Sequence, residues 1–189
     1  MNVLMLGNSF TFYNDMPNIL SMMLNEKVES ITRGGAYLYQ FLDSADELNV
    51  KLLEALAQKK WDYIILQEQS NTPALKRDIF QNSVNELCKL IRQNGAKPLL
   101  YATWAYRDGT EKLASTGLTF IEMDQALYAS YHDAAEANGT LIADVGKAFC
   151  AIRPFADPYF RDDYHPSWSG SVVAALTIAN VILRDAKQE

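Results

Sequence analysis

Two short motifs near opposite ends of the chain contain the residue types of an activated hydroxyl nucleophile. Gly7-Asn8-Ser9-Phe10-Thr11 follows the first apolar run, and Asp162-Asp163-Tyr164-His165-Pro166 precedes the last helical pattern. Together they supply a serine, a histidine and a carboxylate, the three groups that convert a serine hydroxyl into a nucleophile. Because the chain contains 2 histidines, a serine-based mechanism has few choices for its general base.

The histidine motif predicts which ring nitrogen meets which partner. Asp162 lies three residues before His165. A short loop of this spacing lets the carboxylate reach one nitrogen of the imidazole and leaves the other nitrogen to face Ser9. Asp163 is the competing carboxylate, and since adjacent residues project differently, only one of the two is expected to orient the ring. His132 lies within a predicted helix and is interpreted as a surface or packing residue.

Three loops could supply donors for an oxyanion. Gly7 permits a tight turn before Ser9, where the first backbone N–H groups of a helix are free. Gly34-Gly35 follows the second predicted strand, so that the Gly35 N–H could point at a developing oxyanion. Gln67-Glu68-Gln69-Ser70-Asn71 ends the most apolar strand, and the Gln69 amide is the preferred side-chain donor. The alternatives are that these residues only cap helices or form ordinary turns.

The bulk composition is that of an ordinary globular protein. The chain has 189 residues, 49% hydrophobic and 21% charged, which fits a single domain over residues 1–189. A net charge of −6 without a Lys/Arg cluster argues against nucleic-acid binding. Cys88 and Cys150 form no metal motif and are expected to be free thiols. No leader or membrane span is visible, so the default expectation is a cytoplasmic protein without membrane insertion, although a trimmed leader would give the same sequence.

Short apolar runs alternate with helical patterns along the chain. Strands are expected at Val3–Leu6, Val28–Thr32, Tyr63–Leu66, Pro98–Thr103 and Thr140–Val145. Helices are expected at Met16–Leu24, Tyr37–Leu42, Leu48–Gln58, Pro73–Asn94, Leu118–Asn138 and Gly170–Asp185. This alternation predicts an α/β fold in which helices cover both faces of a parallel five-stranded sheet.

Ligands bind outside the carboxyl ends of the strands in such a sheet. The serine loop, the Gly-Gly loop, the glutamine-rich loop and Thr103–Tyr106 all follow strands and should meet at that edge. The polar segment Tyr106–Gly117, which contains two glycines, is expected to form a surface loop near the site, with a possible lid role.

These blocks make the chain resemble the SGNH (GDSL-like) hydrolases. Gly7-Asn8-Ser9 is similar to the family's Gly-Asp-Ser block, with Asn in place of Asp, and Asp162 to His165 match its Asp-x-x-His block. Gly34-Gly35-Ala36 is similar to the glycine block after the second strand. The third block departs, because Gln67-Glu68-Gln69-Ser70 stands where the family has Gly-x-Asn-Asp, a run similar to carbohydrate-esterase-like relatives. Gln69 takes the asparagine's place, with Gln67 or Asn71 as alternatives.

The resemblance implies a flavodoxin-like three-layer α/β/α sandwich and a serine esterase that needs no metal or organic cofactor. The expected catalytic residues are Ser9, His165 and Asp162, the expected oxyanion hole is Ser9, Gly35 and Gln69, and the expected substrate-binding residues are Asn8, Gln67, Trp104 and Tyr164.

The expected partner is a small-molecule ester, and the oligomeric state is left open. Aromatic residues gather in the predicted site loops, namely Phe10, Phe12, Tyr13, Tyr37, Tyr39, Trp104, Tyr106, Tyr164 and Trp168. Such residues line sugar sites and also acyl pockets. A short-chain or acetyl ester of a carbohydrate is preferred, because the chain has little length for a deep acyl tunnel. A lysophospholipase or thioesterase for longer chains and a non-catalytic sugar-binding protein are the alternatives.

Overall fold

The core of the molecule is a parallel five-stranded sheet. The structure, a computed structural model, describes residues 1–188. The strands are β1 (Val3–Gly7), β2 (Val28–Thr32), β3 (Tyr63–Leu66), β4 (Lys97–Ala102) and β5 (Leu141–Asp144), in the spatial order β2-β1-β3-β4-β5. Val3 is in register with Val28 of β2 on one side and with Tyr63 of β3 on the other.

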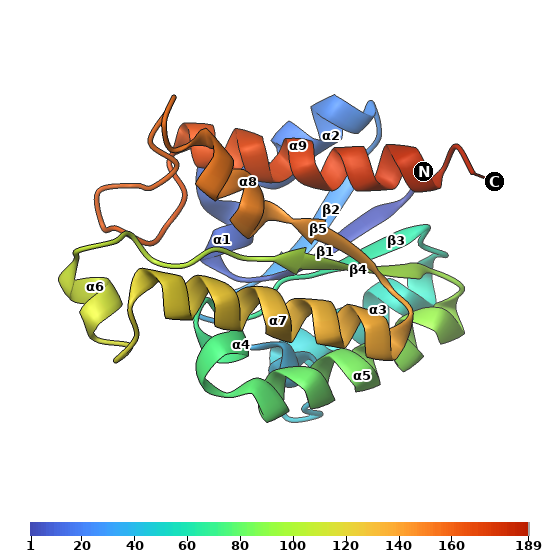
Figure 1. The fold of residues 1–189 in the computed structure, drawn as a ribbon. Coiled ribbons are helices and arrows are strands. Elements are labelled where there is room, and N and C mark those ends of the chain that lie inside the picture. Colours follow the sequence, from blue (N-terminus) through green and yellow to red (C-terminus); the bar gives the residue numbers. More distant parts are fainter. Residues whose placement is uncertain (189) are drawn as a thin grey trace.

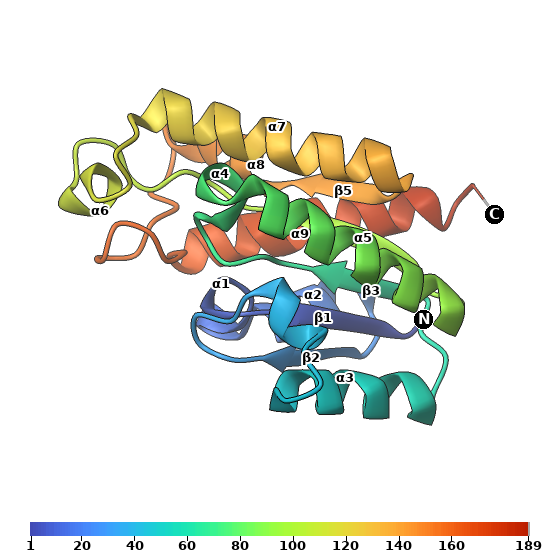
Figure 2. The ribbon, with the colours of Figure 1, turned by 90° about the horizontal axis from the view of Figure 1, so that it is seen from below.

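Helices cover both faces of this sheet, which confirms the predicted three-layer α/β/α fold. The helices are α1 (Ser9–Phe12), α2 (Met16–Leu24), α3 (Glu47–Gln58), α4 (Thr72–Leu75), α5 (Arg77–Asn94), α6 (Glu111–Ala114), α7 (Phe120–Asn138), α8 (Val145–Ile152) and α9 (Trp168–Asp185). One layer contains α2, α8 and α9, and the other contains α3, α4, α5 and α7 (Figures 1 and 2).

Burial along the strands follows their position in the sheet. Every residue of β1 and β3 is buried, whereas all residues of the edge strand β2 are half-buried or exposed. Helices shield both faces of the central strands, so these strands read as continuous apolar runs rather than alternating ones. The unbroken Tyr63-Ile64-Ile65-Leu66 run therefore identified a central strand correctly.

The helical pattern was least informative at breaks and in short helices. Pro73–Asn94, predicted as one helix, is divided into α4 and α5 at Lys76, whose φ of −137° and ψ of 52° are not helical. Both helices pack on α7, so the apolar pattern continues across the break and hides it. The short helices α1, α6 and α8 were not predicted as such, and Tyr37–Leu42 contains a 3-10 turn at Leu38–Phe41.

The strand order reverses between β1 and β3, which creates the crevice where sheets of this kind bind ligands. From β1 the chain crosses to β2 on one side, and from β3 it continues through β4 to β5 on the other. The loops that follow β1 and β3 therefore flank this crevice. They carry Ser9 and Gln69.

Candidate active site

Ser9, His165 and Asp162 form one chain of hydrogen bonds. The Ser9 Oγ and His165 Nε2 atoms are 2.7 Å apart, and His165 Nδ1 and Asp162 Oδ2 are also 2.7 Å apart. An ionised carboxylate only accepts hydrogen bonds, so the proton of the neutral ring resides on Nδ1. Nε2 is thereby left as the acceptor for the Ser9 hydroxyl, which is the arrangement a general base requires.

The environment of Asp162 keeps this carboxyl ionised. Partial burial raises the pKa of Asp162. Hydrogen bonds from the His165 ring, the His165 N–H and the Tyr164 N–H lower it by more than burial raises it, so the net pKa lies below its ordinary value. Asp162 Oδ1 accepts a hydrogen bond from the His165 backbone N–H at 3.0 Å, while Oδ2 accepts one from Nδ1 of the His165 ring. The loop and the imidazole are therefore fixed by one side chain.

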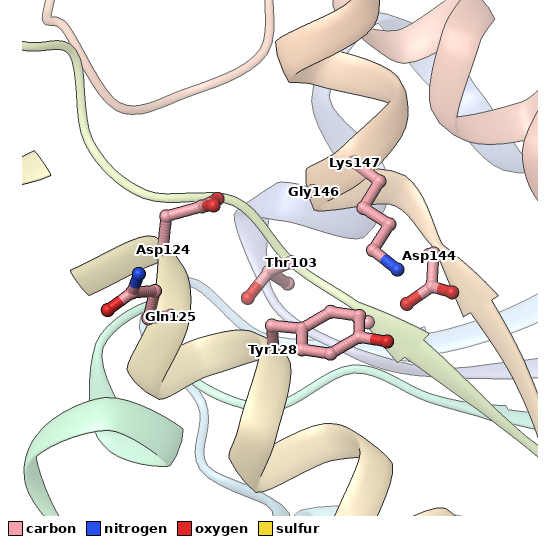
Figure 3. Close-up of a pocket in the computed structure, with 8 residues that line it drawn as sticks. Thr103, Asp124, Gln125, Tyr128, Asp144, Gly146 and Lys147 are labelled. Carbon is pink, nitrogen blue, oxygen red and sulfur yellow. The ribbon is translucent and has the colours of Figure 1, made fainter. Parts of the chain in front are cut away.

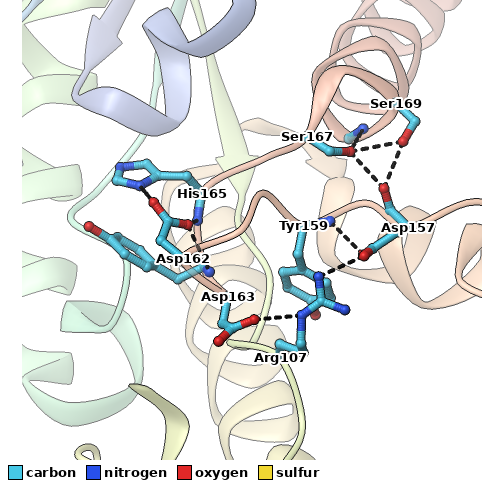
Figure 4. Close-up of polar contacts among 10 residues, drawn as sticks. Arg107, Asp157, Tyr159, Asp162, Asp163, His165, Ser167 and Ser169 are labelled. Carbon is cyan, nitrogen blue, oxygen red and sulfur yellow. Dashed lines mark hydrogen bonds and ion pairs between the residues drawn. The ribbon is translucent and has the colours of Figure 1, made fainter. Parts of the chain in front are cut away.

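Asp163, the competing carboxylate, has a different partner. Its backbone φ of 70° is left-handed, and its Oδ1 lies 2.8 Å from Nε of Arg107. Arg107 also pairs with Asp157 at 2.7 Å, so one guanidinium connects two points of the loop that leads to His165 (Figure 4). Asp162 is the carboxylate that meets the ring, and Asp163 anchors the loop.

The His165 ring is also held by aromatic side chains. Tyr13 is parallel to it, with ring centroids 4.1 Å apart and an interplanar angle of 1°, and Tyr164 lies 4.1 Å away at 39°. Phe10 contacts it edge-on at 5.7 Å. His165 is 8% exposed, so the imidazole keeps one orientation and reaches the solvent only at the pocket.

The turn that presents Ser9 depends on the absence of a side chain at Gly7. A Cβ there would lie 2.5 Å from Gln67 Oε1 and 2.6 Å from Thr11 Oγ1. Gln67 Oε1 accepts the Asn8 N–H and the Thr11 hydroxyl, each at 2.9 Å. The Asn8 side chain caps α1 by accepting the Phe10 N–H at 3.1 Å. The loop is therefore tied down on both sides of Ser9.

Gly35 occupies a turn that favours glycine. Its φ of 69° is left-handed, and the Ala36 N–H donates to the Arg33 carbonyl at 3.0 Å to close the turn. The Asn8 side chain donates to the Ala36 carbonyl at 2.9 Å, which ties this turn to the serine loop. Within residues 1–188, the N–H groups of Ser9 and Gly35 make no hydrogen bond to the protein, and both residues line the same pocket.

The Gln69 amide is fixed so that its nitrogen is the available donor. Its Oε1 accepts the N–H groups of Asn71 and Thr72 at 3.2 Å and the Thr72 hydroxyl at 2.9 Å. Its Nε2 donates to Ser70 Oγ at 3.2 Å and retains a second N–H. Capping α4 and facing the pocket are therefore compatible roles for one side chain.

Glu68, which the sequence reading did not single out, connects two of these loops. One of its oxygens accepts the Leu38 N–H at 3.1 Å and the Gln69 N–H at 2.6 Å, while the other has no hydrogen-bond partner among residues 1–188. The side chain is 0% exposed. Burial raises the pKa of Glu68, and the two backbone hydrogen bonds lower it in part. The net pKa is about 7.

Gln67 and Trp104, expected to bind substrate, lie beneath the pocket instead. Gln67 is 1% exposed, and its side-chain amide oxygen accepts the Asn8 N–H of the serine loop. Trp104 is also 1% exposed and is stacked between Phe10, at 4.5 Å, and Phe149, at 3.8 Å. Amide and aromatic side chains at strand ends are candidates for substrate contact, but these two are buried and support the site from beneath.

A pocket of about 360 Å³ opens above the Ser9–His165 pair. Its lining consists of Asn8, Ser9, Phe10, Tyr13, Gly34, Gly35, Gln69, Ser70, Lys112, Tyr164 and His165. The expected site residues Asn8 and Tyr164 therefore face it. Lys112 belongs to the segment Tyr106–Gly117, so that segment borders the site as predicted.

A second cavity, of about 230 Å³, lies between α7 and the ends of β4 and β5 (Figure 3). It contains none of the predicted site residues. Two of its lining groups have partners: the Asp144 carboxylate meets His132 Nε2, from outside the lining, at 2.8 Å, and the Lys147 ammonium lies 3.9 Å from the centre of the Tyr128 ring. His132, expected to be a surface or packing residue, is half-buried on α7.

Asn14 joins the two ends of the site and was missed by sequence reasoning. Its Nδ2 lies within hydrogen-bond distance of the carbonyls of Pro166 and Ser167, each at 3.1 Å, and of the Ser171 hydroxyl at 2.9 Å. Its φ of 54° is left-handed, a conformation that asparagine tolerates better than most residues. An asparagine just after the serine block was the available signal.

A solved structure with a similar sequence and the same fold carries a hydrolase description. No family model and no curated protein matches the sequence. A solved structure from Slackia heliotrinireducens, described as "a putative SGNH hydrolase", is 36% identical, with a TM-score of 0.92 over 96% of this chain and 98% of its own. The chain belongs to the SGNH hydrolase family.

Other solved structures share the fold at lower identity. A DUF4886 family protein from Bacteroides uniformis has a TM-score of 0.76 at 22% identity, over 96% of this chain and 82% of its own. A variant of an acetyl-xylooligosaccharide esterase from Geobacillus Stearmophilus has a TM-score of 0.70 at 15% identity, over 96% and 93%. At these identities the two structures show a shared fold, and the assignment as a hydrolase rests on the family membership. Among residues 1–188, no helix has the length and apolar character needed to cross a membrane.

Proposed function

We propose that this SGNH hydrolase is a serine esterase that cleaves a short-chain ester, most simply an acetyl ester of a carbohydrate. The observation that carries the proposal is the continuous hydrogen-bond chain from Ser9 through His165 to Asp162 at the floor of an open pocket. A hydroxyl, a base and an orienting carboxylate in series is the arrangement that acyl transfer requires.

In the proposed mechanism, His165 Nε2 removes the Ser9 hydroxyl proton as Oγ attacks the ester carbonyl. Asp162 stabilises the imidazolium that forms. The N–H groups of Ser9 and Gly35 and the Gln69 amide donate to the oxyanion of the tetrahedral intermediate. His165 then protonates the leaving alcohol, and a water activated by the same base releases the acid from the acyl-enzyme.

The lining of the pocket supports a short acyl group. Besides its aromatic residues, the pocket is lined by Gly34, Gln69 and Ser70, which are small or polar. Long acyl chains are bound in apolar clefts that bury most of the ligand surface. A pocket of about 360 Å³ lined in this way fits a small acyl group on a polar alcohol better than a fatty acyl chain.

The test is hydrolysis of 4-nitrophenyl acetate, butyrate and octanoate by the purified protein and by Ser9→Ala. We expect acetate to be preferred, and we expect Ser9→Ala to lower kcat by on the order of 10³-fold, as in other activated-serine systems. A preference for octanoate would favour the longer-chain alternative. Equal rates for wild type and Ser9→Ala would remove Ser9 from the mechanism.

The alcohol is identified separately. Acetylated mono- and oligosaccharides are compared by the acetate they release, with the same Ser9→Ala control. Release that depends on Ser9 supports the carbohydrate ester. Binding of these sugars without release would instead favour the sugar-binding alternative.

A further inference from the structure

Lys112 is the cation that lines the catalytic pocket. It belongs to α6, which lies beside the loop that carries His165 in both views of the ribbon (Figures 1 and 2). Its ammonium is 4.1 Å from the centre of the Tyr164 ring and 5.2 Å from that of Tyr106. The Tyr106 hydroxyl is in turn 2.6 Å from Ser70 Oγ. Two aromatic rings therefore hold a positive charge at the pocket wall.

The Lys112 ammonium differs from other half-buried cations because it forms no ion pair within residues 1–188. Three other half-buried cations form ion pairs with carboxylates: Arg33 with Asp46, Lys59 with Glu29, and Arg107 with Asp157, each at 2.7 Å. No carboxylate among residues 1–188 forms an ion pair with Lys112. The pocket lining itself contains no acidic residue. The positive charge is thus directed toward the space that the substrate would occupy.

We propose that Lys112 forms an anion-binding subsite, and that the substrate is an ester whose alcohol portion bears a carboxylate or another negative group, such as an acetylated acidic sugar. The assignment to the alcohol rests on the proposed function, because an acetyl group has no position for a charge. An attraction of this kind also acts against the net charge of −6, which repels anions from the molecule as a whole.

The experiment compares two esters that differ in charge: 4-acetoxybenzoate, which is an anion, and its methyl ester, which is neutral. Values of kcat/KM are measured for wild type and for Lys112→Met, which keeps the length and apolar character of the side chain. The ratio of the two values is compared between proteins, so the intrinsic reactivities of the esters cancel. We expect Lys112→Met to lower kcat/KM about tenfold for the anion and less than about twofold for the neutral ester.

Matched variants identify the cause. Lys112→Arg keeps the charge and should retain the preference for the anion, whereas Lys112→Glu should reverse it. Lys147→Met is the control, because that ammonium also lies over a tyrosine ring but lines the other cavity. Adding salt should reduce the preference in wild type and leave Lys112→Met unchanged. Equal losses on both esters, or no loss on either, would overturn the subsite.

A charged acyl group is tested with mono-4-nitrophenyl succinate against 4-nitrophenyl butyrate. A Lys112-dependent preference confined to the succinate would overturn the assignment to the alcohol.

The subsite is also tested without turnover, by calorimetric binding of 4-acetoxybenzoate and its methyl ester to Ser9→Ala and to Ser9→Ala/Lys112→Met. Tighter binding of the anion that requires Lys112 supports the subsite even if no ester is hydrolysed, so its failure and that of the proposed function are distinguishable.

Discussion

The two neighbouring aspartates of the histidine loop have different tasks, although their chemistry is the same. Asp162 accepts from the His165 ring at 2.7 Å, and Asp163 pairs with Arg107 at 2.8 Å. By sequence position alone, either carboxylate could reach the ring. The left-handed backbone of Asp163, with its φ of 70°, is what distinguishes the two residues. Variants at these two positions should therefore differ in kind.

We expect Asp162→Asn to lower kcat by on the order of 10²- to 10⁴-fold, because an amide neither stabilises the imidazolium nor fixes the tautomer. Asp163→Asn should leave kcat within a few-fold and lower the thermal midpoint, because it weakens a partly exposed ion pair. Kinetics with 4-nitrophenyl acetate and thermal unfolding of both variants check this. A larger kcat loss in Asp163→Asn would show that Asp163 serves the reaction. His165→Ala should be more damaging than Asp162→Asn, since it removes the base itself.

Glu68 gives stability a pH dependence of predictable sign. Its pKa is about 7 in the folded protein against an ordinary 4.5, so the folded state holds the proton more tightly. Its stabilising contribution is complete below pH 4.5 and is lost as the pH rises toward 7. The difference of about 2.5 pKa units corresponds to roughly 3 kcal/mol. Tyr131 on α7 faces the same carboxyl, but its pKa is also raised and it stays neutral in this range.

Glu68→Gln keeps an oxygen to accept the N–H groups of Leu38 and Gln69 and removes the titration. We therefore expect the free energy of unfolding of Glu68→Gln, relative to that of wild type, to be larger (the variant relatively more stable) at pH 8 than at pH 5. Urea unfolding at the two pH values measures the difference. Parallel behaviour of the two proteins would mean that Glu68 does not titrate in this range.

At the scale of elements, the serine block and the histidine block meet through Asn14. The hydrogen bonds from this amide connect the turn after α1 with the start of α9. Asn14→Ala removes them and places alanine in a left-handed conformation, so we expect about 1–3 kcal/mol of lost stability and a lower kcat with little change in KM. Asn14→Gly, which relieves the backbone but not the lost bonds, is the matched control. If Asn14→Gly regains the full kcat, the amide contacts do not position the loop.

The elements that the sequence predicted well are those with continuous patterns. The apolar strands, and the residue types of Ser9, Asp162 and His165, could be recognised because each depends on local sequence alone. The roles of Gln67 and Trp104 could not, since an amide or indole after a strand looks the same whether it faces a pocket or the core. Glu68 connects its loop to the distant Leu38 N–H, and Asn14 reaches backbone carbonyls just before α9. Distant backbone groups leave no residue pattern to read.

At the scale of the whole molecule, stacked rings connect the site to the hydrophobic core. Trp104 lies between Phe10, next to the serine, and Phe149 of α8. Trp104→Ala should reduce the free energy of unfolding by about 3–5 kcal/mol, because it opens a cavity among fully buried rings. Trp168→Ala, at a position that is 62% exposed, should change it by less than about 0.5 kcal/mol. Urea unfolding compares the two, and equal losses would contradict this account of the core.

The hydrogen bond between Ser9 and His165 joins residues that are 156 positions apart. During synthesis on a ribosome, the proposed nucleophile is therefore made 156 residues before its proposed base. A nascent chain that stops short of the histidine loop holds an ordinary, unreactive serine. Hydrolysis of an ester in a translation reaction should consequently appear only after chains that contain the histidine loop have emerged and folded.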